Sequence, residues 1–371
     1  MNRVAWLLVL VLVGMLELSA ALAAELRPAP GFYRPGLVLR HGGQSVRCPP
    51  VQVFSGALNF PSKYEGDDSS RDDVNPDAIK EYESRTKPMK DLQQFSAQVS
   101  DRLFKGRGNS TDLECLLTHW RAWASQKALL GKPSNHVGNA VRKWSLASFA
   151  TSYLKLKLNL GANISAADQQ LLEGWLAALA TQVQQDYQGR GPDKANNHDY
   201  WAAWSVMVTA VVLQRQDLFD WSYGVYQMAM GQVTEEGYLP NELRRKTRAL
   251  AYHSFALLPL STMAAFAQAN HQSPLLLERK ALQRVAAVVL VNLEDPEPIE
   301  EIAGAKQVDL DFEAGGRLAW LAPYESIVKD PALLPLIKRL VPLKSSSLGG
   351  DQSFIYLRDR PELYPERRKT Q

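Results

Sequence analysis

The stretch T-D-L-E-C-L-L-T-H-W-R-A-W-A-S-Q-K-A-L, residues 111–129, sets a pattern that most of the chain follows. Its apolar side chains recur at the spacing of one face of an α-helix. Thr111 can cap the start of this helix. The same spacing returns at residues 137–153, and again after Ser165, where Asp168 completes the S-x-x-D pattern of a capping box. The apolar positions of the first helix are Leu113, Leu116, Leu117, Trp120, Ala124 and Leu129.

Helix, short loop and helix then alternate along the chain. Tryptophans mark successive helices at intervals of roughly 25–30 residues. This alternation is typical of stacked helical hairpins. We predict an all-α protein whose hairpins close into an α/α toroid, with inner helices lining a cleft. An open solenoid is the alternative, which the irregular repeats disfavour. Further helices are predicted at residues 77–105, 199–214, 217–233, 245–269, 274–292, 314–328 and 331–342.

Residues 1–23 predict a secretory signal peptide. Arg3 gives a basic start, an apolar run follows, and Ala21-Leu22-Ala23 is a small-x-small cleavage signature. The apolar run is too short to span a bilayer comfortably, so a retained signal anchor is the less favoured alternative. No later apolar stretch approaches about 18 residues without charges. We therefore expect no membrane insertion once the signal is removed.

We expect the remaining chain to form one domain. Residues 24–110 are rich in proline and polar residues and predict an irregular N-terminal segment. Within it, residues 59–76 form a very polar loop in which Gly66 can act as a hinge. We interpret this loop as a mobile lid; the alternative is a solvated surface loop. Residues 111–371 form the toroid itself, ending in a basic tail.

Charge and cysteine content narrow the function. The 371 residues include 42 Lys and Arg against 39 Asp and Glu, a net charge of +3. This balance indicates no nucleic-acid partner, so any cationic site must be local. The six histidines show no metal-ligand spacing, and we expect neither metal nor cofactor. Because an exported chain meets oxidising conditions, Cys48 and Cys115 are predicted to form a disulfide between the N-terminal segment and the first strong helix. Two buried free thiols are the alternative.

The segment N-N-H-D-Y-W-A-A-W, residues 196–204, is the first candidate for chemistry. Asn197 or Asp199 can cap the helix that follows. Asn197 and His198 then sit at the helix start, with Trp201 and Trp204 one and two turns along the same side. Polar groups at the ends of secondary-structure elements often serve sites, so we favour a functional interpretation over a structural histidine.

The segment N-E-L-R-R-K-T-R-A-L-A-Y-H, residues 241–253, is the second candidate. On one continuous helix, Arg245 and Tyr252 lie two turns apart on one face, about 10.5 Å along the axis. A buried cation needs an anion, and arginine binds a carboxylate in a bidentate fork. A uronic acid would supply that carboxylate. The structural alternative is a pair between Arg245 and Glu242.

Together these motifs resemble the periplasmic alginate lyases of polysaccharide lyase family 5. The similarity covers essentially the whole mature chain and includes S-K-Y-E-G (62–66) and R-K-W (142–144). It implies an α/α toroid, β-elimination of polymannuronate, and residence in the periplasm of an alginate-producing Gram-negative bacterium, alongside a possible role in the alginate export assembly. Carried over by position, the catalytic residues are Asn197, His198, Arg245 and Tyr252; Lys63 and Tyr64 belong to the substrate-closing loop, and Asn135, His136 and Trp201 contact substrate.

The chemistry itself can be argued from the residues. Elimination removes the C5 proton, which lies α to a carboxylate, so that negative charge must be neutralised as the enediolate forms. Asn197 and Arg245 suit this electrostatic role. In mannuronate, H5 and the leaving oxygen O4 lie on the same face, so one group can act as base and then acid. We expect Tyr252 to do both, with Arg245 and a charged His198 lowering its pKa. In the alternative, His198 is the base and Tyr252 only the acid.

Several further expectations complete the prediction. The family more often has serine at position 199, and an acid there is expected to raise the pKa of His198 if it is close. Arg142 and Lys143 are expected on a solvated face, although they could line a polyanion cleft. His119 and His253 are expected to serve packing, and Trp120, Trp144, Trp175 and Trp221 the core.

Two other functions compete with a lyase. One is a glycoside hydrolase on the same toroid, which needs an acid and a base carboxylate. Asp186, Asp199 and Glu242 are available for those roles. The other is a non-catalytic uronan-binding or scaffold protein of an alginate export complex, which would bind the polymer without consuming it.

Overall fold

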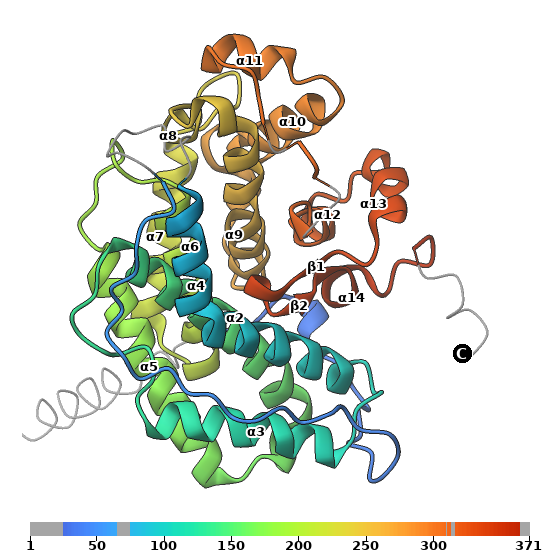
Figure 1. The fold of residues 1–371 in the computed structure, drawn as a ribbon. Helices are drawn as coiled ribbons and strands as arrows, with labels where there is room; N and C mark the ends of the chain where they lie inside the picture. Colours follow the sequence, from blue (N-terminus) through green and yellow to red (C-terminus); the bar gives the residue numbers. More distant parts are fainter. Residues whose placement is uncertain (1–24, 65–74, 309, 313–315, 364–371) are drawn as a thin grey trace, which may run out of the picture.

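A computed structural model describes residues 25–64, 75–308, 310–312 and 316–363 (Figure 1). Four predictions lie wholly or partly outside these described residues. They are the signal peptide at 1–23, most of the lid loop at 59–76, the start of the helix at 314–328, and the basic tail after 363.

Within the described residues, nearly all regular secondary structure is helical, which confirms the all-α prediction. The only strands among them, β1 (Lys344–Ser345) and β2 (Gly350–Asp351), form one short antiparallel pair. The longer helices are α2 (Pro76–Phe104), α3 (Ser110–Ser125), α4 (His136–Leu160), α5 (Ala166–Tyr187), α6 (Asn197–Leu213), α7 (Gln216–Gly231), α9 (Ala249–Ala269) and α10 (Ala281–Glu294). The shorter ones are α8 (Pro240–Leu243), α11 (Glu297–Ala303), α12 (Leu321–Val328), α13 (Leu334–Leu340) and α14 (Gln352–Leu357).

The helices form an inner and an outer layer. Helices α4, α6 and α9 are buried along most of their length, and in α6 every residue from Asp199 to Val212 is buried. A helix that is apolar on all sides is a core helix. Helices α5, α7 and α10 bury only one face and cover the inner layer from outside. This is the hairpin arrangement of inner and outer helices expected for a toroid.

One helical stretch, Lys246–Ala269, is long and apolar enough by composition to cross a membrane. However, 83% of its most apolar window is buried inside the protein. Helix α9, which makes up most of this stretch, runs through the centre of Figure 1 between α6 and α12. The apolar run is therefore explained by its place in the core.

The helices begin with the expected kinds of capping residue, but two of these caps lie at other positions than predicted. Asn109, rather than Thr111, caps α3, and the Asp112 carboxylate in turn accepts a hydrogen bond from the Asn109 N–H. Asn196 caps α6 in the same way with Asp199. Each box satisfies two backbone donors that a helix start leaves unpaired. Ser165 caps α5 as predicted.

The predicted helix at 245–269 is interrupted. After α8, a single 3₁₀ turn (Lys246–Arg248) precedes α9, and Lys246 has a φ of 46°. The side chain of Gln307 donates to the carbonyl of Lys246 and accepts from the N–H of Leu250. These tertiary hydrogen bonds replace the helical ones at this point. Arg245 and Tyr252 therefore do not share one continuous helix, contrary to the prediction.

The C-terminal third also departs in detail from the prediction. The helix predicted at 274–292 is split into a 3₁₀ segment (Pro274–Arg279) and α10 by a run of positive φ angles from Glu278 to Lys280. The helix predicted at 331–342 is shorter, because a 3₁₀ turn (Pro331–Leu333) precedes α13. The hairpin β1–β2 and helix α14 were not predicted.

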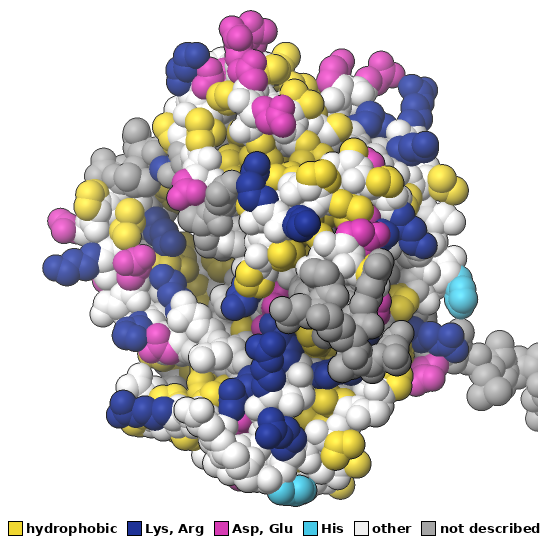
Figure 2. Space-filling view, turned by 90° about the vertical axis from the view of Figure 1, so that its right-hand side faces the viewer, with side chains coloured by type: hydrophobic (Ala, Val, Ile, Leu, Met, Phe, Trp, Pro, Cys, Tyr) yellow, Lys and Arg dark blue, Asp and Glu magenta, His cyan; other side chains and the backbone are white. Residues whose placement is uncertain are grey.

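Charge is unevenly spread over the surface. On the face shown in Figure 2, acidic side chains gather at the end formed by α10 and α11, while Lys and Arg gather lower on the same face. Glu297, Glu300 and Glu301 of α11 belong to the acidic end. Although the net charge is only +3, acidic and basic side chains lie in separate regions of this face, so a local cationic site is compatible with it.

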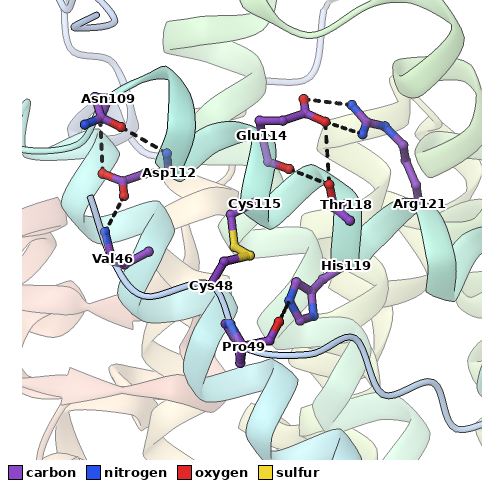
Figure 3. The surroundings of a disulfide bond; sticks show 10 residues. All are labelled: Val46, Cys48, Pro49, Asn109, Asp112, Glu114, Cys115, Thr118, His119 and Arg121. Carbon is purple, nitrogen blue, oxygen red and sulfur yellow. Dashed lines mark hydrogen bonds and ion pairs between the residues drawn. A yellow bond between two sulfur atoms is a disulfide. The ribbon is translucent and has the colours of Figure 1, made fainter. Parts of the chain in front are cut away.

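The predicted disulfide is present (Figure 3). Cys48 in the extended N-terminal segment is bonded to Cys115 on α3, with their Cα atoms 5.9 Å apart. The same junction contains a hydrogen bond from the N–H of Val46 to Asp112 (2.7 Å). His119 Nε2 is 3.1 Å from the carbonyl oxygen of Pro49, which agrees with its predicted packing role. These contacts fasten the irregular segment to the helical toroid.

Replacing both cysteines by serine is expected to lower the free energy of unfolding by about 2–4 kcal/mol, because the bond closes a loop of 67 residues. Urea unfolding of the variant and of the oxidised and reduced wild type measures this. Specific activity of the folded variant should be unchanged, because neither cysteine lines the cavity described below. Equal unfolding midpoints for the oxidised and reduced forms would contradict the prediction.

Candidate active site

A cavity of about 880 Å³ opens where the three inner helices begin. It is lined by the first turns of α4, α6 and α9, by residues 62–64, by the loop before α6, and by α8 with the turn that follows. The N-terminus of each helix carries partial positive charge. Three such ends therefore face one cavity, which favours an anionic ligand.

Cationic side chains dominate the cavity wall. Among the described lining residues, Asp193 is the one carboxylate, against seven cations. Aromatic rings of Tyr82, Trp144 and Phe255 supply apolar faces between them. This combination suits a sugar polymer that carries a negative charge on each unit. The seven cations are Lys63, Arg190, Lys194, Arg244, Arg245, Arg248 and Arg317.

Asn197 is held in place by a buried carboxylate. Its backbone N–H donates to Glu242 Oε1 (2.6 Å), and its side-chain amide donates to both Glu242 oxygens (3.2 and 3.0 Å). Burial raises the pKa of Glu242 to about 6, although the charge of Arg245 and the bonds from Asn197 oppose this. Glu242 therefore orients the amide of Asn197, and the predicted interaction of Glu242 with Arg245 is also present as an electrostatic effect.

His198 is a neutral imidazole facing the cavity. Its Nδ1 lies 2.7 Å from Nζ of Lys143, and its ring centroid lies 4.8 Å from that of His136. Burial and then the charge of Lys143 hold the pKa of His198 well below its usual value. The expectation that Asp199 raises this pKa was wrong, because the Asp199 carboxylate instead accepts from the N–H of Asn196 and pairs with Arg190 (2.9 Å each).

Arg245 and Tyr252 meet despite the broken helix. The guanidinium carbon of Arg245 lies 4.8 Å from the centroid of the Tyr252 ring. The hydroxyl of Tyr252 lies 3.2 Å from that of Tyr64. Burial first, and then Tyr64, raise the pKa of Tyr252 above its ordinary value, while Arg245 lowers it less strongly. The expected net lowering was therefore wrong, and Tyr252 is a protonated phenol.

Of the residues expected to contact substrate, Lys63, Tyr64 and His136 line the cavity, and two others lie elsewhere. The side chain of Asn135 caps α4 and bonds to the carbonyl oxygen of Phe60 (2.7 Å). It fixes the segment before Lys63 instead of lining the cavity. Trp201 is fully buried and packs behind Phe255, with 5.2 Å between ring centroids.

The sequence prediction missed several residues of this site. Trp144, expected in the core, lines the cavity, with its ring 5.9 Å from that of His198. Arg142 and Lys143 are fully buried instead of solvated. Arg142 pairs with Asp186 and donates to the carbonyl of Leu129. The available signal was two adjacent cations in a helix that has no polar face.

The three carboxylates considered for a hydrolase are all engaged. Asp186 pairs with Arg142, Asp199 with Arg190, and Glu242 with Asn197. None of them lines the cavity. Among the described residues, the one group of side chains close enough to share a metal ion is Cys48, Cys115 and His119, and its two cysteines are joined in the disulfide.

Comparison with known proteins assigns the family. The profile of the family described as alginate lyase matches residues 59–299. An alginate lyase of Pseudomonas aeruginosa is 40% identical over 349 residues, covering 93% of this chain and 94% of the relative. One of Azotobacter vinelandii is 40% identical over 352 residues, covering 93% of each. The chain belongs to the alginate lyase family. It is thereby a polysaccharide lyase that acts on alginate, as the sequence resemblance implied.

The fold agrees with this family. The crystal structure of alginate lyase A1-III from Sphingomonas species A1 superposes with a TM-score of 0.71 at 24% identity, covering 84% of this chain and 86% of that one. An alginate lyase from Bacteroides ovatus gives a TM-score of 0.57 at 14% identity. The predicted α/α toroid is confirmed.

His253 predicts a pH dependence of stability. It is fully buried; Nε2 accepts from the N–H of Leu239 (2.9 Å), so Nδ1 carries the proton donated to the carbonyl of Ala249 (2.8 Å). Burial lowers its pKa to about 4. The neutral ring therefore stabilises the fold fully above pH about 6.5, and up to about 3 kcal/mol is lost as the pH falls to about 4.

Urea unfolding of the wild type and of His253→Gln between pH 4 and 7.5 measures this contribution. The glutamine takes up no proton, so the stability difference between the two proteins should shrink as the pH falls. A difference that stays constant over this range would contradict the prediction.

Proposed function

We propose that this protein cleaves 4-linked mannuronate in alginate by β-elimination, leaving a 4,5-unsaturated uronate at the non-reducing end of one fragment. The observation that carries the proposal is the meeting of His198, Arg245 and Tyr252 in one cation-lined cavity. These residues come from two motifs that are more than forty positions apart. The cavity supplies both charge neutralisation and proton transfer, which the reaction needs together.

Neutralising the uronate carboxylate is the first requirement. The C5 proton is only weakly acidic while the neighbouring carboxylate is fully charged. Arg245 supplies a fixed cation, and His198 and Asn197 supply polar groups at the start of α6, where the helix also favours negative charge. As negative charge builds up on the enediolate, its interactions with these groups become stronger than those of the ground-state carboxylate, which lowers the barrier.

Tyr252 is the proton donor to the leaving oxygen O4, since burial keeps its phenol protonated. It is also positioned to take the C5 proton from the same face of mannuronate. If substrate displaces the contact with Tyr64, two of the effects that raise the pKa of Tyr252 are removed, while Arg245 continues to lower it. His198 is the other candidate for the base.

We also propose residence in the periplasm. The signal-peptide pattern of residues 1–23 and the disulfide between Cys48 and Cys115 support export to an oxidising compartment. Association with an alginate export assembly rests on the sequence resemblance alone.

Separate incubation with polymannuronate and polyguluronate tests the reaction and its specificity. The unsaturated product absorbs in the near ultraviolet, and we expect absorbance to rise much faster with polymannuronate. New reducing ends without that absorbance would establish a hydrolase. Binding with neither signal would establish a non-catalytic uronan-binding protein. Equal rates on both polymers would overturn the mannuronate preference.

Tyr252→Phe and Arg245→Ala are expected to lower kcat by about 10²–10⁴-fold, since they remove the proton carrier and the fixed cation. Steady-state kinetics on polymannuronate, with circular dichroism to verify folding, measures this. Tyr226→Phe is the matched control, because Tyr226 is buried on α7 away from the cavity. Near-wild-type turnover in Tyr252→Phe would remove Tyr252 from the mechanism.

A further inference from the structure

A fully buried lysine lies behind His198 and has no role in the mechanism above. Lys143, on α4, is 0% exposed. Its Nζ lies 2.7 Å from His198 Nδ1, 2.9 Å from the His198 carbonyl oxygen and 2.8 Å from the Tyr187 hydroxyl. A buried lysine without compensating partners is costly, so three contacts within hydrogen-bond distance indicate a built position.

The number of N–H donors on Lys143 determines which ring nitrogen of His198 carries the proton. An ammonium group has three N–H donors and no acceptor, which matches three accepting partners. The carbonyl oxygen of His198 can only accept, and Nδ1 then also accepts. A neutral ring that accepts at Nδ1 carries its proton on Nε2. Nε2 is the nitrogen left to meet a ligand, since His198 lines the cavity.

We infer that Lys143 is a positioning residue that holds His198 with its proton on Nε2, so that a neutral imidazole donates a hydrogen bond to the uronate carboxylate. The inference rests on the proposed function of the same cavity and deepens it. An imidazole in this tautomer cannot accept the C5 proton at Nε2, so Tyr252 is left as the base. Lys143 thus decides between the two mechanisms without touching the substrate.

The electrostatics around the ring agree with this arrangement. Burial, and then the charge of Lys143, lower the pKa of His198 and keep the ring neutral. Burial also lowers the pKa of Lys143 well below its usual value, while Asp199 and Asp186 oppose this shift and favour the charged form that the three accepting contacts require. The titratable and charged groups around His198 are Lys143 and His136 on α4, Tyr187 on α5, Arg190 in the following loop, Asp199 on α6, and Glu242 and Arg245 at and after α8.

Imidazole nitrogen NMR of the wild-type protein labelled with ¹⁵N-histidine tests the tautomer directly. His198→Gln identifies the signals of His198 among the six histidines. At neutral pH we expect a protonated Nε2 and an unprotonated Nδ1. The opposite tautomer would overturn the inference, because Lys143 would then be a neutral acceptor and Nε2 a free base. This measurement requires no variant of Lys143 to fold.

Lys143→Met tests the consequence for turnover. Without the lysine, the pKa of His198 rises and the neutral ring is free to take either tautomer. In mildly acidic solution the doubly protonated ring still offers its Nε2–H, but at alkaline pH it does not do so reliably. We therefore expect kcat to fall by about 10²-fold or more at alkaline pH, and by less as the pH is lowered. KM should change less than kcat.

Lys155→Met is the matched control. Lys155 is a second fully buried lysine on α4, bonded to Asp101 and to the carbonyl of Gly349 (2.6 Å each), and does not line the cavity. Its loss should lower stability and leave the shape of the pH–rate profile unchanged. A Lys143→Met profile that is lowered uniformly, as for Lys155→Met, would reduce Lys143 to a structural role. Absence of unsaturated product from the wild type would instead refute the proposed function, whatever the tautomer.

Discussion

Cations on the inner helix α4 are held out of water, and each needs compensation, since an unpaired buried charge costs several kcal/mol. Arg142 is compensated by Asp186 on α5, and Lys143 by the hydroxyl of Tyr187 on the same helix and by His198 on α6. These contacts join three helices at the cavity. The side chains that compensate these buried charges therefore also fix the orientation of His198.

The toroid concentrates positive potential at the cavity where we propose that the uronate carboxylate binds. All three inner helices begin at the cavity. The interruption of the helix after α8 brings Arg245 against the ring of Tyr252. Glu242 is buried and accepts hydrogen bonds from Asn197, so the amide is oriented from behind, and Glu242 interacts electrostatically with Arg245. In the proposed mechanism, the groups that neutralise the substrate are thus already oriented before substrate binds. Electrostatic catalysis gains most from such preorganised groups.

The sequence predicted the helices better than the site, for physical reasons. Apolar periodicity is local, so α3 to α7 were placed within a few residues. The interruption of the helix before α9 depends on Gln307, some sixty positions later, so no local sequence pattern predicts it. In α6 every face is buried, so spacing did not reveal that Trp201 packs behind Phe255. The pKa of Tyr252 was predicted from two neighbouring cations, Arg245 and a charged His198, whereas burial outweighs Arg245 and leaves His198 neutral.

The central claim is that the cavity recognises and neutralises the uronate carboxylate. Calorimetric binding of a short oligomannuronate to the Tyr252→Phe protein, compared with the same oligomer after reduction of its carboxyl groups, tests this most directly. The account predicts salt-sensitive binding of the charged oligomer and at least a tenfold weaker affinity for the reduced one, about 1.4 kcal/mol or more. Equal affinity for both oligomers would contradict it.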